Sequence, residues 1–144
     1  MSIPPAQTAP GPAMRRPPSL LPTAADAAAT EAVVRAHLRA FVEGRGVAAL
    51  LADYREDALL CCDGETFRGR TQIGAFFTAF LAGLPAGAVE RFELSALQVH
   101  GRLAYITWRS GDDIPLGTDT FLVEGGRIAA QTVAVYRAAR PSAR

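Results

Sequence analysis

The sequence contains neither lysine nor asparagine, and all 15 of its basic residues are arginine. Without lysine the chain cannot form a Schiff base, and it lacks the lysine of a P-loop and of a Ser-Lys dyad. The 15 basic residues are balanced by 14 acidic ones, so the charge gives no footprint for nucleic acid or for an anionic membrane. The missing lysine and asparagine, with the many alanines, are typical of a GC-rich bacterial genome. We therefore expect neither a nucleic-acid nor a membrane partner.

Cysteine and histidine are scarce, with two residues of each. Cys61 and Cys62 are neighbours, which point to opposite faces of a strand, so a disulfide between them would need unusual geometry. We therefore expect a reducing, cytoplasmic setting. The two histidines lie far apart in the chain and make no metal-ligand spacing with the cysteines. Neither a metal nor another cofactor is expected, and no apolar run approaches the ~20 residues of a membrane span.

Proline is concentrated at the N-terminus, where residues 1–22 hold seven of the ten prolines. This composition is typical of a flexible, disordered tail with polyproline II character. Met1 and Met14 both remain as possible start residues. We predict one folded domain over residues 23–138 and a short tail over residues 139–144.

The first half of the domain shows helical patterns. Thr23 and Asp26 have the spacing of a capping box, and Val34, Leu38 and Phe41 recur at i, i+4 and i+7, which predicts a helix. Residues 46–54 predict a short second helix, residues 55–69 a strand that turns at an Asp-Gly pair, and residues 71–85 a third helix. All three helices precede the main run of strands.

Beyond residue 88 the apolar period changes to 2, and we predict strands over 89–99, 102–110, 116–124 and 127–138. Helices followed by antiparallel strands indicate an α+β fold, in which one strongly bent sheet wraps around the helices. On the third of these strands Asp119 shares a face with Phe121 and Val123. We expect Asp119 to point into a pocket. The alternative is a structural carboxylate held by backbone N–H groups or by an arginine.

The segments "DYREDALLCCDGETFRGRTQIGAFF" and "GTDTFLVEGGRIAAQTV", in this order and spacing, resemble the nuclear transport factor 2-like superfamily. That superfamily includes ketosteroid isomerases, SnoaL-like polyketide cyclases and limonene epoxide hydrolases. The resemblance covers about residues 23–138. It implies a cone-shaped, cystatin-like fold with a strongly curved antiparallel sheet around about three helices, one apolar pocket and often a homodimer.

Ketosteroid isomerases use a strand aspartate as general base, with a tyrosine and a protonated aspartic acid that bind the oxyanion. The resemblance places Asp119 at the oxyanion-binding acid. It places Leu38 at the tyrosine and Cys62 at the general base, one residue before Asp63. Two of the three groups are therefore absent or altered, which argues against that mechanism.

Two other branches make different demands. Epoxide hydrolases need an arginine beside the aspartate, but the strand here reads Gly117, Thr118, Asp119. Arg109 on the neighbouring strand could replace it only if it pointed inward, and the alternation of that strand places Arg109 on the face opposite to Trp108. Polyketide cyclases can use a single aspartate as acid and base, and Asp119 is compatible with that role.

The remaining candidates each have a plainer interpretation. His37 could border the pocket mouth as an acid or base, or be a half-exposed helix residue. Cys62 could be a nucleophile or a small buried apolar residue. Six residues are expected around the cavity by facing and family position, although aromatic residues at such spacing also form plain cores: Tyr54, Phe77, Trp108, Gln131, Val133 and Val135.

The sequence thus predicts a protein that binds a hydrophobic small molecule and uses Asp119 in a cofactor-independent proton transfer of the isomerase or cyclase type. Two alternatives stay open: a non-catalytic ligand-binding or dimerisation module, and an epoxide hydrolase-like activity.

Overall fold

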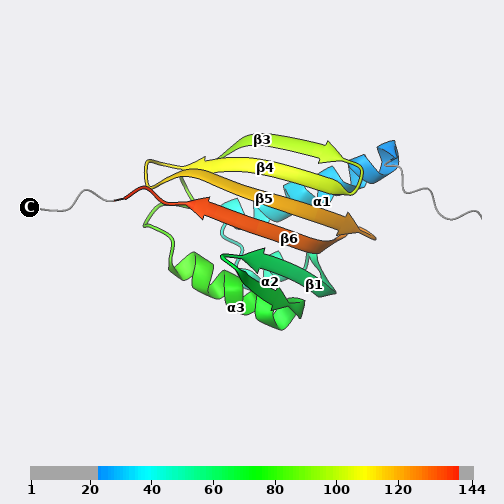
Figure 1. The fold of residues 1–144 in the computed structure, drawn as a ribbon, viewed down its shortest axis with the longest axis horizontal. Helices are drawn as coiled ribbons and strands as arrows, with labels where there is room; N and C mark the ends of the chain where they lie inside the picture. The colour runs from blue at the N-terminus through cyan, green and yellow to red at the C-terminus, as the bar shows by residue number, and fades with distance from the viewer. Residues whose placement is uncertain (1–22, 140–144) are drawn as a thin grey trace, which may run out of the picture.

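The computed structural model describes residues 23–139, and Figure 1 shows their fold. The predicted tails, 1–22 and 139–144, lie outside the described residues apart from Ala139, as do both possible start residues. The elements in chain order are α1 (Ala24–Val42), α2 (Val47–Leu51), β1 (Tyr54–Cys62), β2 (Glu65–Arg68), α3 (Gly69–Ala82), β3 (Phe92–His100), β4 (Leu103–Ser110), β5 (Ile114–Glu124) and β6 (Arg127–Tyr136).

The predicted capping box begins α1. The Thr23 hydroxyl accepts a hydrogen bond from the Asp26 backbone N–H at 3.1 Å, and the Asp26 carboxylate accepts one from the Thr23 backbone N–H at 3.3 Å. The third helix begins at Gly69, two residues before the predicted Thr71. The Gln72 side chain accepts from the backbone N–H of the N-cap residue at 2.8 Å, and this contact satisfies a group that has no partner within the helix.

The six strands form one sheet in the order β2-β1-β6-β5-β4-β3. Four of the neighbouring pairs are antiparallel, as predicted, but β1 and β6 pair in parallel. The curved sheet of the predicted fold is present, and the parallel β1–β6 pair departs from the antiparallel pairing expected for it. These strands are not consecutive in the sequence, so no turn between them fixes their relative direction. The strand predicted at residue 89 begins at Phe92, because the preceding residues form a turn.

The sheet is curved, and its inner face is covered by the helices, with α1 against β3, β4 and β5 and α3 against β1 and β2 (Figure 1). The core lies between these layers. Its largest fully buried side chains include Tyr54, Phe121, Leu60, Ile73 and Ile106. The architecture is therefore the α+β fold predicted from the sequence, with a concave sheet face that holds the site described below.

The outer face of the sheet carries exposed apolar side chains. Leu103 lies opposite Leu122, Leu116 lies opposite Tyr136, and Tyr105 is 38% exposed. The homodimer expected from the sequence stays a prediction. Among the helices of the described residues, none is long and apolar enough to cross a membrane, and the cytoplasmic location also stays a prediction.

Candidate functional site

Asp119 points from the middle of β5 toward the helices and is 9% exposed. Its Oδ1 accepts a hydrogen bond from Trp108 Nε1 at 2.9 Å, and its Oδ2 accepts one from Gln131 Nε2 at 2.8 Å. The donors belong to β4 and β6, the two strands beside β5. The side chain of Asp119 faces the inner side of the sheet, and the carboxylate is held by two side chains and by no arginine among the described residues.

Gly117 makes the contact between Trp108 and Asp119 possible. It lies directly opposite Trp108 across the β4–β5 pair. A Cβ at Gly117 would lie within 3.0 Å of the indole carbons, so the ring can lie over β5 only because this residue has no side chain. The indole nitrogen then reaches Asp119, two residues further along the same face. The sequence did not predict this role, because a glycine two residues before a buried acid is a weak signal.

The electrostatics of Asp119 are dominated by burial. Burial raises the pKa of the carboxyl above its usual value, while the hydrogen bonds from Trp108 and Gln131 and the charge of His37 act in the opposite direction. The acid can therefore take up a proton closer to neutral pH than an exposed aspartate does.

A chain of buried polar groups continues from Asp119 toward α1. Gln131 Oε1 accepts a hydrogen bond from the Tyr54 hydroxyl, whose oxygen lies 3.3 Å from His37 Nε2. His37 Nδ1 lies 3.4 Å from Asp53 Oδ2 but makes no well-aligned hydrogen bond within residues 23–139. Burial, followed by the charges of Asp119 and Asp53, raises the pKa of Tyr54 well above its usual value. Tyr54 is therefore neutral.

Two residues of this chain of polar groups differ from what the sequence predicted. His37 is 4% exposed, so the interpretation as a half-exposed helix residue is wrong. Asp53 was not identified as a candidate, because it lies in the connection between α2 and β1 and only the tertiary fold brings it to His37.

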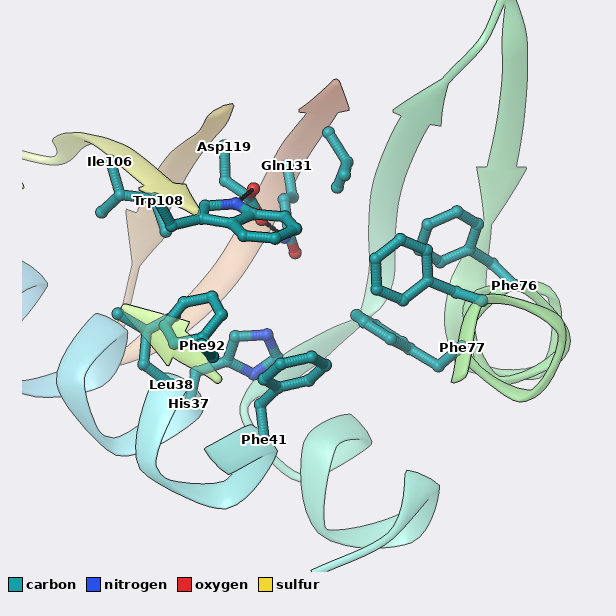
Figure 2. A pocket seen from close by; sticks show the side chains of 12 residues that line it. His37, Leu38, Phe41, Phe76, Phe77, Phe92, Ile106, Trp108, Asp119 and Gln131 are labelled. Carbon is teal, nitrogen blue, oxygen red and sulfur yellow. Dashed lines mark hydrogen bonds between the residues drawn. The ribbon is translucent and has the colours of Figure 1, made fainter. Parts of the chain in front are cut away.

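Asp119 borders a small cavity between α1, α3 and the sheet, whose polar and aromatic side chains converge in Figure 2. The space open to the centre of a water molecule is about 30 Å³. A single water needs ~10–15 Å³ by this measure, so only a few waters fit. The lining residues are His37, Leu38, Phe41, Phe76, Phe77, Phe80, Phe92, Ile106, Trp108, Asp119, Gln131 and Val133.

Four of the six predicted binding residues thus line the cavity: Phe77, Trp108, Gln131 and Val133. Tyr54 lies behind it, within the polar chain. Val135 and Cys62 instead line a separate groove on the surface.

Cys62 and Arg109, unlike His37, are not part of the cavity that Asp119 borders. Burial, with the charges of Asp63, Asp119 and Glu65, raises the pKa of Cys62, so its thiol is not activated as a nucleophile. Arg109 is exposed on the outer face, and the epoxide hydrolase alternative therefore lacks its arginine. Within residues 23–139, no three His, Cys, Asp or Glu side chains form a group that could hold a metal ion.

Comparisons with known proteins identify the fold. No family model matches the chain, and no curated protein matches it by sequence. An NTF-2-like protein of unknown function from Burkholderia xenovorans is 21% identical with a TM-score of 0.63, over 80% of this chain and 88% of its own. A putative ketosteroid isomerase from Kribbella flavida is 20% identical with a TM-score of 0.62, over 83% and 86%. A putative polyketide cyclase from Sinorhizobium meliloti is 19% identical with a TM-score of 0.59, over 72% and 94%.

These identities show a shared fold and no shared ligand or reaction. The resemblance to the nuclear transport factor 2-like superfamily is confirmed at the level of the fold, which ketosteroid isomerase-like, SnoaL-like and cystatin-like structures share.

Proposed function

We propose that this chain, which has the nuclear transport factor 2-like fold, binds a small, mainly apolar ketone and transfers a proton of that ketone through Asp119. The observation that carries the proposal is a buried carboxylate, with its pKa raised by burial, at the edge of a cavity lined with aromatic rings. Apolar walls and one convergent polar group are typical of sites for small organic ligands. No cofactor is needed for such a step.

The chemistry suits a single buried acid. The hydrogen atoms on a carbon next to a carbonyl group are weakly acidic, and a carboxylate with a raised pKa is a stronger base than an exposed one. Trp108 and Gln131 fix both carboxylate oxygens, so the direction from which a carbon acid can approach is defined. Return of the proton to another carbon would complete an isomerisation, and attack of the enolate on a second carbonyl would complete a cyclisation.

A ligand of this kind needs more room than the cavity of about 30 Å³ provides, because pockets for drug-sized ligands have volumes of ~300–1,000 Å³. Phe76 and Phe80 line both this cavity and the surface groove, which has a volume of about 630 Å³. Their rings stack with centroids 5.5 Å apart. The ring pair is therefore a wall between the two spaces, and its movement would connect Asp119 to the groove.

Replacing Phe80 with alanine is expected to open this wall. Phe80 is only partly buried and lies at the C-terminal half of α3, so its removal leaves most of the core in place. We expect the association rate of 2-naphthol to rise at least ~10-fold, because a larger fraction of the protein is already open to the ligand. Stopped-flow quenching of Trp108 fluorescence measures this rate.

The matched control is Leu81→Ala, which removes a partly buried side chain from the next position of α3 without touching either space. An equal rise in this variant, or no rise in Phe80→Ala, would show that the phenylalanine pair does not control entry.

The proposed function is tested with 2-tetralone, a bicyclic ketone with acidic hydrogen atoms on the carbon between its carbonyl group and its ring. In D₂O, NMR should show that the protein accelerates exchange of these hydrogen atoms and that Asp119→Asn reduces the acceleration ~100-fold or more. Thr118→Ala, which changes the next residue on the opposite sheet face, should retain the wild-type rate.

A non-catalytic binding module is the second candidate. It is favoured by the residues at the positions of the other two catalytic groups of ketosteroid isomerases. Leu38, at the tyrosine position, lines the cavity without a polar group, and Cys62, at the general-base position, lies outside the cavity. Binding of 2-tetralone with no acceleration of exchange would support this candidate and refute proton transfer through Asp119.

A further inference from the structure

The buried polar chain has a carboxylate at each end. Asp119 lies at one end and Asp53 at the other, with Gln131, Tyr54 and His37 between them. Asp53 is partly exposed, whereas the other four residues are at least nine-tenths buried. The direction of each hydrogen bond in such a chain follows from what each group can donate or accept. An ionised carboxylate only accepts, and each amide, hydroxyl or imidazole atom can donate or accept a fixed number of hydrogen bonds.

With Asp119 ionised, every direction in the chain follows. Gln131 must donate from Nε2 to Asp119, which leaves Oε1 to accept from the Tyr54 hydroxyl. The oxygen of Tyr54 then has to accept, so His37 Nε2 carries a proton. His37 Nδ1 faces Asp53 Oδ2 at 3.4 Å without an aligned hydrogen bond, and a proton on Nδ1 avoids two acceptors facing each other. In this arrangement His37 is an imidazolium.

The reverse direction is equally complete once Asp119 holds a proton. Asp119 then donates to a Gln131 amide that has turned round, and Gln131 Nε2 donates to the oxygen of Tyr54. The Tyr54 hydroxyl donates to an unprotonated His37 Nε2, while Nδ1 keeps its proton for Asp53. Both arrangements contain the same number of protons, and they differ in whether Asp119 or His37 holds one of them.

We propose that His37 is a second acid–base group of the Asp119 site, positioned by Asp53 and linked to Asp119 through Tyr54 and Gln131. The inference rests on the proposed function for its chemistry. His37 lines the same cavity as Asp119. The titratable groups that face it are Asp53 before β1, Tyr54 on β1 and Asp119 on β5, while α3 presents only Phe77.

The two arrangements match the two sides of an enolisation. Asp119 takes the proton of the substrate carbon as the C–H bond breaks, and His37 gives its Nε2 proton to the substrate oxygen as an O–H bond forms. Ketone with ionised Asp119 and imidazolium becomes enol with protonated Asp119 and neutral imidazole. No oxidant, reductant or further reactant is needed, and reversal of the chain keeps Asp119, Gln131 and Tyr54 hydrogen-bonded.

The experiment reads the two histidines by ¹⁵N imidazole NMR in the full chain without ligand, with His100 as an internal reference. At pH 7 we expect protons on both ring nitrogens of His37 in the wild type. Asp119→Asn mimics the protonated acid, since its Nδ2 donates to a turned Gln131. It should reduce the ratio of doubly to singly protonated His37 about 10-fold, leaving the proton on Nδ1.

Tyr54→Phe cuts the chain and provides the decisive comparison. In this background Asp119→Asn should change the His37 ratio less than ~3-fold, because the two sites no longer share hydrogen bonds. A wild-type His37 that is already neutral, or an undiminished effect of Asp119→Asn after the cut, would overturn the link.

The catalytic role is tested separately with 2-tetralone. Both His37→Gln and the more exposed Asp53→Asn should slow exchange at least ~10-fold, with a changed pH profile. Exchange that proceeds normally in folded samples of both variants would refute this role of His37 and leave the proposed function of Asp119 standing.

Discussion

Replacing Gly117 with alanine is expected to lower the free energy of unfolding by about 3 kcal/mol, because the new methyl group would overlap the Trp108 ring. Its Cβ would lie within 3.0 Å of three carbons of the Trp108 ring. That ring is 5% exposed and is held by its hydrogen bond to Asp119, so it cannot swing aside cheaply. Displacing it would also leave one oxygen of a buried carboxylate without its donor.

Urea unfolding measures this loss, and the fluorescence of the single tryptophan reports whether the ring has moved. The matched control is Thr118→Ala, one residue along the strand and on the opposite face, which should cost less than about 1 kcal/mol. Equal stabilities of Gly117→Ala and Thr118→Ala, with an unchanged emission maximum, would show that the sheet absorbs the methyl group without moving Trp108.

The order of the secondary-structure elements could be predicted because each element is determined by a pattern of nearby residues in the sequence. The capping residues of α1, the helical spacing of Ile73, Phe76 and Phe77 in α3, and the alternation in β5 all act over a few residues. The parallel pairing of β1 with β6 could not be predicted in this way, because alternation identifies a strand and not its partner.

The candidate site also has parts that local patterns predict and parts that they do not. The burial of Asp119 follows from its place between apolar neighbours on one face of β5, and the inward facing of Trp108 and Gln131 follows from the same period. The link from Tyr54 to His37 and Asp53 joins β1, α1 and a loop, and it depends on tertiary distances that no spacing encodes. The small size of the cavity depends on side-chain packing by Phe76 and Phe80, which sequence facing alone does not determine.

The pH dependence of stability provides the second large effect. Burial raises the pKa of Asp119 in the folded state above its value near 3.8 in the unfolded chain. Well below pH 3.8 both states hold the proton, and Asp119 carries no penalty. As the pH rises from there to the folded pKa, the unfolded state loses its proton first, so stability falls. Asp119→Asn lacks this loss.

We therefore expect the free energy of unfolding of Asp119→Asn, relative to the wild type, to increase between about pH 4 and the folded pKa and then to level off. The increase should be about 1.4 kcal/mol for each unit by which the pKa is raised. Urea titrations at pH 4, 5, 6 and 7 measure it, and carboxylates common to both proteins cancel in the difference.

The sign of this effect has an internal control in Asp57. Asp57 is exposed, and its hydrogen bond with Arg55 lowers its pKa. Asp57→Asn should therefore change relative stability in the opposite direction, and only slightly, because solvent screens the pair. A difference for Asp119→Asn that stays flat, or that follows the sign of Asp57→Asn, would mean that hydrogen bonds from Trp108 and Gln131 outweigh burial. Asp119 would then be a structural carboxylate and no longer a base with a raised pKa, which would remove the premise of proton transfer at this site.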